Sequence, residues 1–541
     1  MTIVLSELKE FERVEMLEEV MTDLPSFSYW FNKIDRSYRE SIRKSAKFQY
    51  RPYQSKYAAM SCLRQFNLLA YSMGAGKTTI SILIIQAIYN LVDRPKQIHI
   101  AVPSILAAQR WLEDLAIVFP SSRFEYVSTE AELHKSAAQI IIYNHDLPKR
   151  LSKDKSTTKP KHLSGYLSKL YKPSLLVVDE IHALSNSRSD RARHLLKIRL
   201  KSKRVLGLTG TLIDSKLDNI DRICRFVYNS LWSFSGNSFV NHFSEKKKVQ
   251  SNYLTGDEGE GNRYLDFLST YKLEEYYATV RRFVHRLTLN EPQVSDFIKI
   301  PEQVDVVTIV EPSVEQKKIY NEYLDGHRRQ LDILSTTVAK EYQPRALEII
   351  YPLVKTVNVS VETEDTSKVK EILRIVKDKS KVAIFCNYVE SGNYLTKRLQ
   401  AVYGDKVLRL SAECSQVARI EIVKQFQYGI SKIGVFSSNL AAEAIDLTAA
   451  DCVIFYCLPW SSLKIQQSIA RVIRPGNIYD RVEIHYLATK GCIDVHQLNL
   501  AQDKLKLARR ALDYDDIGED TFNHSSTINP NQVLLNLLLG E

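Results

Sequence analysis

The feature that most restricts the fold of this 541-residue chain is a glycine-rich loop that ends in lysine and threonine. The loop is Met73-Gly74-Ala75-Gly76-Lys77-Thr78, and it follows an apolar run from Asn67 to Tyr71. A second apolar run, Leu175 to Val178, leads directly into Asp179-Glu180-Ile181-His182. Glycine loops that open a helix and carboxylates that end a strand occur together in nucleotide-binding α/β folds. The sequence therefore predicts such a fold, with a site for the phosphates of ATP.

The glycine loop supplies the groups that bind phosphate. Gly74 and Gly76 let backbone N–H groups approach the phosphates, Lys77 reaches the β- and γ-phosphates, and Thr78 holds Mg²⁺. Tyr71 stands where the longer form of this loop has glycine, so the match is to the shorter GxGKT form. A glycine turn without a ligand is the alternative. The candidate ATP-binding residues of the loop are Gly74, Ala75, Gly76, Lys77, Thr78 and Thr79.

The carboxylate pair predicts metal binding and general base catalysis. Adjacent carboxylates at the end of a buried strand are costly unless positive charge compensates for them. We expect Mg²⁺ to bind Asp179 together with Thr78, and Glu180 to activate a water molecule. The alternative is an acidic pair that only caps the next helix.

Two further segments are candidates for coupling and catalysis. His182 is expected to relay the nucleotide state to the turn Thr209-Gly210-Thr211, although such turns also occur without a function. Gln467, Arg471 and Arg474 are spaced by four and three residues, which predicts one face of a helix. We expect an arginine there to stabilise charge on the γ-phosphate, the alternative being a surface ion-pair face. The catalytic candidates are Lys77, Asp179, Glu180, Gln467, Arg471 and Arg474.

Apolar runs alternate with helical patterns in two parts of the chain. Continuous rather than alternating apolar runs indicate strands that are buried on both faces of a parallel sheet. The expected strands are 67–71, 97–102, 139–143, 175–178, 204–208, 381–385, 406–410, 433–437, 452–457 and 482–487. The expected division is a helical segment 1–45, a first lobe 46–225, a helical insertion and linker 226–366, a second lobe 367–491, and a C-terminal helix and tail 492–541.

The formal net charge of +11 favours a polyanion partner, although a merely basic surface gives the same total. No apolar run approaches the length of a membrane span, and the acidic N-terminal stretch does not resemble a secretory signal. We therefore expect an intracellular protein of the cytoplasm or nucleus, or of the host cell if it is viral. The apolar tail Val533 to Leu539 either docks on the protein itself or binds a partner protein.

These motifs, in this order, resemble those of the superfamily 2 helicases, and more narrowly the helicase-like ATPases of the SWI/SNF type. The resemblance implies two RecA-like parallel-sheet lobes with helical insertions, and Gln54 in Arg51-Pro52-Tyr53-Gln54 as the contact to adenine. It also implies that Pro103-Ser104 and Trp111 belong to a segment that touches the nucleic-acid backbone. Asp179 to Asn186 is similar to the DEGH segment of the family, and Thr209 to Leu212 to its TGTP turn, with Leu212 in place of proline.

The chain departs from the family in the second lobe. Where relatives have glycines, it has alanines at three positions of Leu440 to Leu447, and Asp446 is the coupling candidate there. Alanine resists a positive φ, so the turn is expected to be more helical. Arg471 to Arg474 is also similar to the corresponding segment of viral transcription ATPases of the poxvirus nucleoside triphosphatase I type.

The resemblance implies a nucleic-acid-dependent ATPase that uses ATP and Mg²⁺. Our first hypothesis is a motor that translocates on DNA, expected to be duplex, and remodels or displaces protein–nucleic-acid complexes. A strand-separating DNA or RNA helicase is the second. The third is a non-hydrolysing structural subunit of a transcription complex, suggested by the alanine-substituted turn.

Overall fold

The computed structural model of this protein describes most of the chain between residues 25 and 501. The described residues are 25–43, 49–91, 97–149, 151–152, 161–162, 172–212, 217–249, 263–268, 272–336, 343–359, 365–438, 440, 445–495, 497–499 and 501. The alanine positions 441, 442 and 444, the helix expected beyond residue 501 and the apolar tail 533–539 lie outside them. Among the described helices, none has the length and apolarity needed to cross a membrane.

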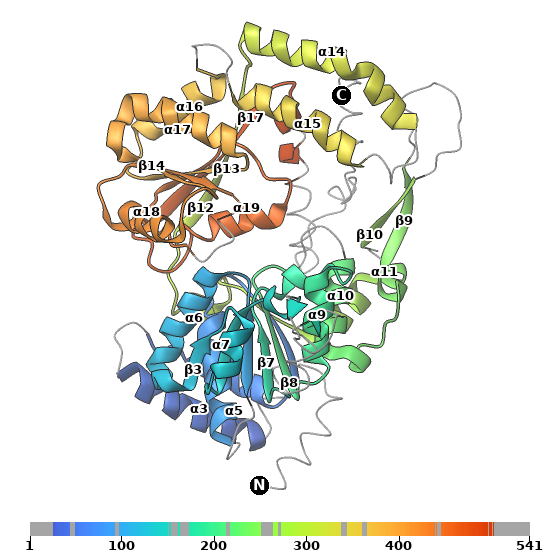
Figure 1. Ribbon diagram of the computed structural model, residues 1–541, viewed down its shortest axis with the longest axis vertical. Coiled ribbons are helices and arrows are strands. Elements are labelled where there is room, and N and C mark those ends of the chain that lie inside the picture. The colour runs from blue at the N-terminus through green and yellow to red at the C-terminus, as the bar shows by residue number, and fades with distance from the viewer. Residues whose placement is uncertain are drawn as a thin grey trace. The chain divides into compact units, whose positions relative to one another are not determined.

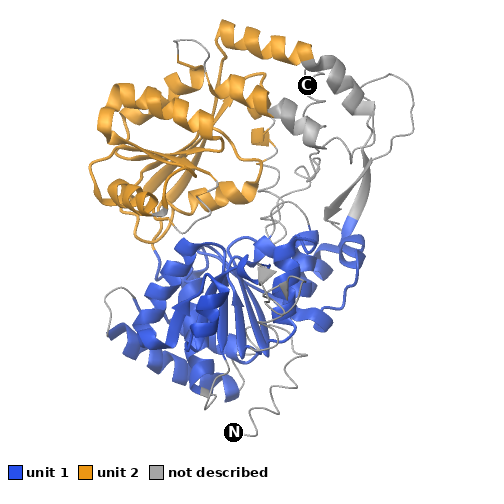
Figure 2. Ribbon diagram, in the orientation of Figure 1, with its two compact units in different colours: residues 1–245, 268–298, 511–514 blue, residues 246–267, 299–510, 515–541 orange. Residues whose placement is uncertain are grey.

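The chain divides into two compact units (Figure 2). Unit 1 comprises Met1–Glu245, Leu268–Ile298 and Ala511–Tyr514, and unit 2 comprises Lys246–Phe267, Lys299–Arg510 and Asp515–Glu541. The segment 226–366, which was expected to separate the two lobes, therefore contributes residues to both units.

A parallel sheet of seven strands forms the centre of unit 1 in the described part of the chain (Figure 1). Its strands, in spatial order, are β11 (Val284–Leu287), β1 (Phe66–Tyr71), β8 (Arg204–Thr209), β7 (Leu175–Val178), β2 (Ile98–Val102), β4 (Ile140–Asn144) and β3 (Phe124–Tyr126). Every residue of β2 and β7 is buried, as expected for strands covered on both faces. Because the strands are parallel, the loops after β1, β7 and β8 leave from the same edge of the sheet.

Helices alternate with these strands. They are α3 (Pro25–Arg43), α4 (Pro52–Cys62), α5 (Lys77–Leu91), α6 (Ile105–Val118), α7 (Glu130–Lys135), α9 (Asp190–Arg199), α10 (Asp218–Tyr228), α11 (Ser238–Phe243), α12 (Leu273–Phe283) and α13 (Pro292–Ser295). Hydroxyl side chains cap several of them: Ser104 Oγ accepts a hydrogen bond from Ala107 N at 3.2 Å, and Ser189 Oγ accepts one from Ala192 N at 3.3 Å. Such caps satisfy backbone N–H groups in the first turn and fix where the helix begins.

A second parallel sheet forms unit 2, with six strands among the described residues. The strands, in spatial order, are β12 (Glu302–Val310), β17 (Arg481–Thr489), β16 (Cys452–Phe455), β13 (Val382–Cys386), β15 (Ile433–Ser437) and β14 (Val407–Leu410). The helices are α14 (Val314–Thr336), α15 (Gln343–Asn358), α16 (Ser367–Lys377), α17 (Val389–Tyr403), α18 (Gln416–Tyr428) and α19 (Ser462–Ile469). Figure 1 shows α16 and α17 on one side of this sheet and α18 and α19 on the other.

Short strand pairs complete the described secondary structure: β5 (Leu151–Ser152) pairs with β6 (Lys161–His162), and β9 (Ser244–Val249) with β10 (Arg263–Leu268). The predicted class, α/β with two parallel-sheet lobes and helical insertions, is confirmed. All ten predicted strands are present, with ends that differ by at most two residues.

The prediction of a helical segment over 226–366 was incomplete. Strand β11 in this segment pairs with β1, so that Leu68 lies opposite Val284, and β12 pairs with β17 along its whole length. Both strands lie at an edge of their sheet, where one side lacks a neighbouring strand. The burial of β12 alternates between exposed and half-buried residues, so it lacks the continuous apolar pattern of the central strands.

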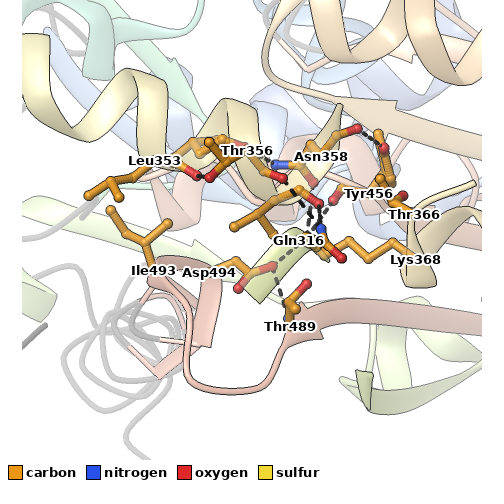
Figure 3. Close-up of polar contacts among 12 residues, drawn as sticks. Gln316, Leu353, Thr356, Asn358, Thr366, Lys368, Tyr456, Thr489, Ile493 and Asp494 are labelled. Carbon is orange, nitrogen blue, oxygen red and sulfur yellow. Dashed lines mark hydrogen bonds and ion pairs between the residues drawn. The ribbon is translucent and has the colours of Figure 1, made fainter. Parts of the chain in front are cut away.

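A buried polar network joins the helices of unit 2 to the carboxyl end of its sheet (Figure 3). Lys368 Nζ on α16 lies 2.5 Å from Asp494 Oδ2, and both side chains are almost fully buried. The same ammonium donates to Asn358 Oδ1 at 3.0 Å and to the carbonyl of Tyr456 at 3.2 Å. Asp494 Oδ2 also accepts from the backbone N–H of Thr489 at 2.9 Å. A buried charge is tolerated when it is paired and hydrogen-bonded in this way.

Candidate nucleotide-binding site

The glycine loop connects β1 to α5 in unit 1. Gly74 and Gly76 both have φ of 89°, a left-handed conformation that glycine adopts without strain. Helix α5 begins at Lys77, so its free N–H groups and the positive end of its dipole face the loop. Lys77 Nζ donates to the carbonyl of Tyr71 at 2.8 Å, which holds the ammonium over the loop. The loop therefore has the backbone shape and the positive charge that bind phosphate groups.

The segment before the loop packs directly against it. Tyr53 Oη on α4 donates to the carbonyl of Ala75 at 3.0 Å. Gln54 is 2% exposed, and a Cβ added to Gly76 would lie 2.0 Å from Gln54 Nε2, so the side-chain amide occupies the space beside this glycine. The residue expected to contact adenine is thus adjacent to the loop expected to bind phosphate.

Asp179 and Glu180 follow β7 at the same edge of the sheet. Glu180 N donates to Asp179 Oδ1 at 3.0 Å, and the indole Nε1 of Trp111 donates to Asp179 Oδ2 at 3.0 Å. Burial, and secondly the charge of Glu180, raise the pKa of Asp179 to about 6, against the opposing effects of Trp111 and Lys77. A carboxylate in such surroundings is one whose charge a cation would stabilise.

Asp179 and the hydroxyl of Thr78 are hard oxygen ligands of the kind that Mg²⁺ uses beside substrate phosphates. No cluster of three or more His, Cys, Asp or Glu side chains that could hold a metal appears among the described residues. Because Mg²⁺ in phosphate-transfer sites needs only one or two protein ligands, these two residues fit it.

His182, in the short helix η4 (Ile181–Leu184), connects the carboxylates to the turn after β8. Its Nδ1 lies 3.2 Å from Glu180 Oε2 and 3.1 Å from Thr209 Oγ1. Thr209 Oγ1 donates to the carbonyl of Thr211 at 2.6 Å and accepts from its N–H at 3.1 Å. A continuous polar path therefore runs from Glu180 to Thr211.

Gly210 brings this turn against the glycine loop. A Cβ at Gly210 would lie 2.9 Å from Met73 Cγ and 3.3 Å from Lys77 Nζ, so a larger residue would displace these side chains. The cause is the order of strands, because β8 lies between β1 and β7 and pairs with both. The structure thus brings together all unit 1 candidates: Gln54, Gly74, Ala75, Gly76, Lys77, Thr78, Thr79, Asp179, Glu180, His182, Thr209, Gly210 and Thr211.

The ends of β2 and β4 form a second polar group in unit 1. Asn144 Nδ2 donates to the carbonyl of Pro103 at 3.0 Å, and Asn144 Oδ1 accepts from the N–H of Asp146. Asp146 in turn accepts two hydrogen bonds from Arg191, at 2.8 and 2.9 Å. Hydrogen bonding to Arg191 lowers the pKa of Asp146 to about 2. This edge is therefore held in one arrangement by its own side chains.

The family resemblance implied that Trp111 belongs to a segment that touches the nucleic-acid backbone, and in the structure the Trp111 side chain itself is buried. Its side chain is 1% exposed and directed inward, because Trp111 shares the buried face of α6 with Ala107, Ala108 and Leu115. The indole is thus a partner of Asp179 and is not available to a nucleic-acid backbone. The spacing of apolar residues along 105–118 was the signal that could have shown this.

The candidates Gln467, Arg471, Arg474 and Asp446 belong to unit 2. The prediction of one helix for Gln467, Arg471 and Arg474 was wrong: α19 ends at Ile469, so of these three residues only Gln467 lies on it. Arg471 N donates to the carbonyl of Ser468 at 3.1 Å, which closes a tighter turn, and Pro475 disfavours a helical backbone at Arg474.

The loop that contains Asp446 meets the same turn. Arg474 Nη1 donates to the carbonyl of Ile445 at 3.3 Å, and Leu447 N donates to the carbonyl of Arg471 at 3.0 Å. Gln467 and Arg471 are buried, whereas Asp446 is exposed. The backbone of Arg471 and the side chain of Arg474 are therefore tied to residues 445 and 447.

Two family models match the chain. Residues 53–361 match the SNF2-related domain, and residues 366–476 match the helicase conserved C-terminal domain. The first match covers more than half of the chain. The glycine loop, the carboxylates and the Thr209 turn lie in the first match, and Gln467, Arg471 and Arg474 lie in the second.

Curated relatives are similar over most of the chain. The bifunctional helicase and thymine dioxygenase JBP2 of Trypanosoma brucei brucei is 26% identical over 520 residues, covering 84% of this chain and 45% of the relative. An uncharacterized ATP-dependent helicase, YqhH of Bacillus subtilis, is 24% identical over 469 residues, covering 83% of this chain and 77% of that helicase.

A third relative is the SWI/SNF-related matrix-associated actin-dependent regulator of chromatin subfamily A-like protein 1 of Xenopus tropicalis. It is 24% identical over 458 residues, covering 82% of this chain and 43% of the relative. The chain thus spans less than half the length of two of these three relatives.

Proposed function

The chain belongs to the SNF2-related family of helicase-like ATPases, and from this premise we propose that it is a nucleic-acid-dependent ATPase that translocates on duplex DNA. We further propose that this movement remodels or displaces protein–nucleic-acid complexes. ATP and Mg²⁺ are its proposed substrate and cofactor.

The proposal that the chain hydrolyses ATP rests on one arrangement of residues in unit 1. The phosphate-binding loop follows β1, and the Asp179 and Glu180 carboxylates follow β7, at the same edge of one parallel sheet in which β8 lies between these two strands. A purely structural subunit has no need for a desolvated carboxylate beside a phosphate loop, because its burial costs free energy. The contact of His182 with Thr209 supports the proposed polar relay, and Gly210 brings the turn that carries it against the glycine loop.

In the proposed reaction, Lys77 and the N–H groups of the loop neutralise the phosphate charge, and Gln54 selects the base. Thr78 and Asp179 would hold Mg²⁺, which supplies positive charge to the phosphate oxygens when it is bound. Glu180 accepts a proton from the attacking water, and His182 keeps the Glu180 side chain in place. Arg474, Arg471 and Gln467 of unit 2 are the proposed groups that stabilise the transition-state charge.

Charge and family membership support the proposed DNA partner. The net charge of +11 favours binding to phosphates, and one of the reported relatives is named a regulator of chromatin. Pro103 and Asn144 at the ends of β2 and β4 are the proposed contacts to the phosphate backbone, as are residues near Asn387 in unit 2. Backbone contacts of this kind would allow movement without reading the base sequence.

A strand-separating helicase is the second candidate, favoured by the helicase names of the relatives. Displacement of a triplex-forming oligonucleotide from duplex DNA distinguishes the two, because translocation removes the third strand and leaves the duplex intact. We expect ATP-dependent triplex displacement by the wild type and none by Glu180→Gln. Separation of a forked duplex at a comparable rate would instead favour the helicase. ATP hydrolysis without triplex displacement or strand separation would contradict the motor function.

A further inference from the structure

The segment that follows β11 starts beside the glycine loop. Because β11 pairs with β1 in parallel, this segment and the glycine loop leave the same edge of the sheet. The backbone N–H of Ser72 donates to the carbonyl of Leu287 at 2.8 Å, which ties the two segments together where they leave their strands. Residues 288–297, which include the short helix α13, therefore begin next to the proposed nucleotide site.

Two side-chain contacts hold this segment along α4. Gln293 Nε2 donates to Tyr57 Oη at 3.0 Å, and the ring of Phe297 lies against that of Tyr53, with the ring centroids 6.4 Å apart. Tyr53 and Tyr57 are one turn apart on α4, so the segment follows this helix towards its N-terminus. Phe297 thus lies next to Tyr53, whose hydroxyl donates to the carbonyl of Ala75 in the glycine loop at 3.0 Å.

The Phe297 side chain is exposed, although its neighbours are not. Phe297 is 45% exposed, whereas Tyr53 and Gln54 are 3% and 2% exposed. Among the described phenylalanine, tyrosine and tryptophan side chains of unit 1, only Tyr29 is exposed to a similar degree. A single exposed ring needs no explanation by itself. This one, however, lies beside the residue proposed to contact the base and the loop proposed to bind the phosphates.

We propose that Phe297 is a stacking residue for the base of ATP, with its exposed ring against one face of the base. This inference rests on the proposed use of ATP and adds a second contact to the base. Every base has a π-face, so stacking on an aromatic side chain strengthens binding without selecting among bases. Gln54 then contacts the edge of the base, and Phe297 adds affinity through its face.

Loss of the ring is expected to weaken the binding of the base and to leave the binding of the phosphates unchanged. Phe297→Ala should raise the dissociation constants of ATP and GTP by a similar factor, about five- to a hundredfold, the range of one base–aromatic stack. Tripolyphosphate offers three linked phosphates without a base, so its dissociation constant should stay at the wild-type value. A role of Phe297 in shaping the glycine loop through Tyr53 would instead weaken all three ligands.

Two further variants separate stacking from packing. Phe297→Leu keeps an apolar side chain against Tyr53 but lacks a flat face, so we expect most of the loss that Phe297→Ala shows. Phe297→Trp keeps a flat ring and should bind both nucleotides nearly as the wild type does. Tyr29→Ala is the matched control, because Tyr29 is 51% exposed in the same unit and its ring contacts Trp30 and Lys33. We expect Tyr29→Ala to leave the binding of all three ligands unchanged.

The test measures the dissociation constants of ATP, GTP and tripolyphosphate, each with Mg²⁺, by displacement of a nucleotide that carries a fluorescent group on its ribose. Thermal unfolding of each variant shows that it is folded. The proposal predicts weaker binding of both nucleotides in Phe297→Ala and Phe297→Leu, and near-wild-type binding in Phe297→Trp and Tyr29→Ala. The affinity for tripolyphosphate should be the same in all of them.

Unchanged nucleotide affinity in Phe297→Ala would overturn the proposal, and it is the result expected if the ring contacts nucleic acid or another protein. An equal loss of tripolyphosphate binding, an equal loss in Tyr29→Ala, or a wild type that binds ATP no better than tripolyphosphate would also overturn it. Because the readout is binding, a wild type that shows the predicted pattern but does not hydrolyse ATP would contradict the proposed function and leave this inference supported.

Discussion

Glu180 has a left-handed backbone, with φ of 48° and ψ of 52°, which is uncommon for a residue with a side chain. The neighbouring carboxylates have different partners: Asp179 accepts from Trp111, and Glu180 lies beside His182. Strained backbones of this kind persist where the surrounding structure enforces them, often at functional sites. Here the strain accompanies two acidic side chains for which we propose different tasks.

Trp111 is expected to tune the metal site through Asp179. In Trp111→Phe the carboxylate loses its indole donor and keeps the hydrogen bond from Glu180 N, so it is held less firmly and half-maximal ATPase activity should require several times more Mg²⁺. Binding of Mn²⁺ followed by electron paramagnetic resonance measures the same loss without turnover.

Trp232→Phe is the matched control, because Trp232 Nε1 donates to Asp221 Oδ1 at 2.8 Å elsewhere in unit 1. Both variants should lower the free energy of unfolding by about 1–3 kcal/mol, since each leaves a buried carboxylate with one donor fewer. The Mg²⁺ requirement should change only for Trp111→Phe, and an equal shift in both variants would rule out a specific role for Trp111.

His99 makes the stability of unit 1 dependent on pH. The side chain is fully buried in β2, and burial lowers the pKa of His99 to about 3, whereas an unfolded histidine titrates near pH 6.5. Below pH 6.5 the unfolded chain therefore binds a proton that the folded chain does not. The contribution of neutral His99 to the free energy of unfolding is complete above pH 6.5. It falls by about 1 kcal/mol per pH unit as the pH decreases towards 3.

Urea unfolding at pH 7.5, 6.5 and 5.5 checks this expectation. The decrease in unfolding free energy between pH 6.5 and 5.5 should be smaller in His99→Gln than in the wild type. His134→Gln, a change at a half-exposed histidine on α7, should keep the wild-type slope. Identical slopes in the wild type and His99→Gln would show that His99 does not cause the acid sensitivity.

Helices and strands that follow local patterns could be predicted, and those fixed by distant contacts could not. The glycine loop and the strand before Asp179 are local signals, because a few consecutive residues carry both shape and chemistry. Strand β12 was missed because an edge strand alternates in burial. The turn after α19 is tied to residues 445 and 447 by Arg474 Nη1 and by the Arg471 carbonyl, contacts that no local pattern indicates. Tyr38 and Gln54 meet across 16 positions of sequence, and no spacing rule indicates that contact.

The network around Lys368 is expected to hold α15 and α16 to the sheet of unit 2. Lys368→Met leaves the Asp494 carboxylate buried without its ion-pair partner, so the free energy of unfolding should fall by about 3–5 kcal/mol. The double variant Lys368→Met/Asp494→Asn should be more stable than the sum of the single effects predicts, because it removes both charges.

Lys355→Met is the control for that experiment. Lys355 Nζ lies 2.8 Å from Glu390 Oε2, but both side chains are about half exposed, so removal of this pair should leave the stability nearly unchanged. Chemical denaturation of all variants compares the two ion pairs. A Lys368→Met variant as stable as Lys355→Met would contradict a structural role for the buried network.

Each unit has its own parallel sheet and its own share of the proposed machinery. The phosphate loop, Asp179 and Glu180 belong to unit 1, whereas Gln467, Arg471 and Arg474 belong to unit 2. Because one chain carries both sets, we propose that DNA binding and hydrolysis are coupled through the paired action of the units. Residues 441–444, where the sequence departs from its family, lie outside the described residues.

The rate of ATP hydrolysis with and without nucleic acid tests this account most directly. Turnover is measured for the wild type and Glu180→Gln, alone and with duplex DNA, single-stranded DNA or RNA. We predict that duplex DNA raises the wild-type rate severalfold and that Glu180→Gln remains inactive under every condition. A wild-type rate that no nucleic acid changes would contradict the proposed DNA-dependent ATPase. Equal turnover by the wild type and Glu180→Gln would contradict the proposed role of Glu180.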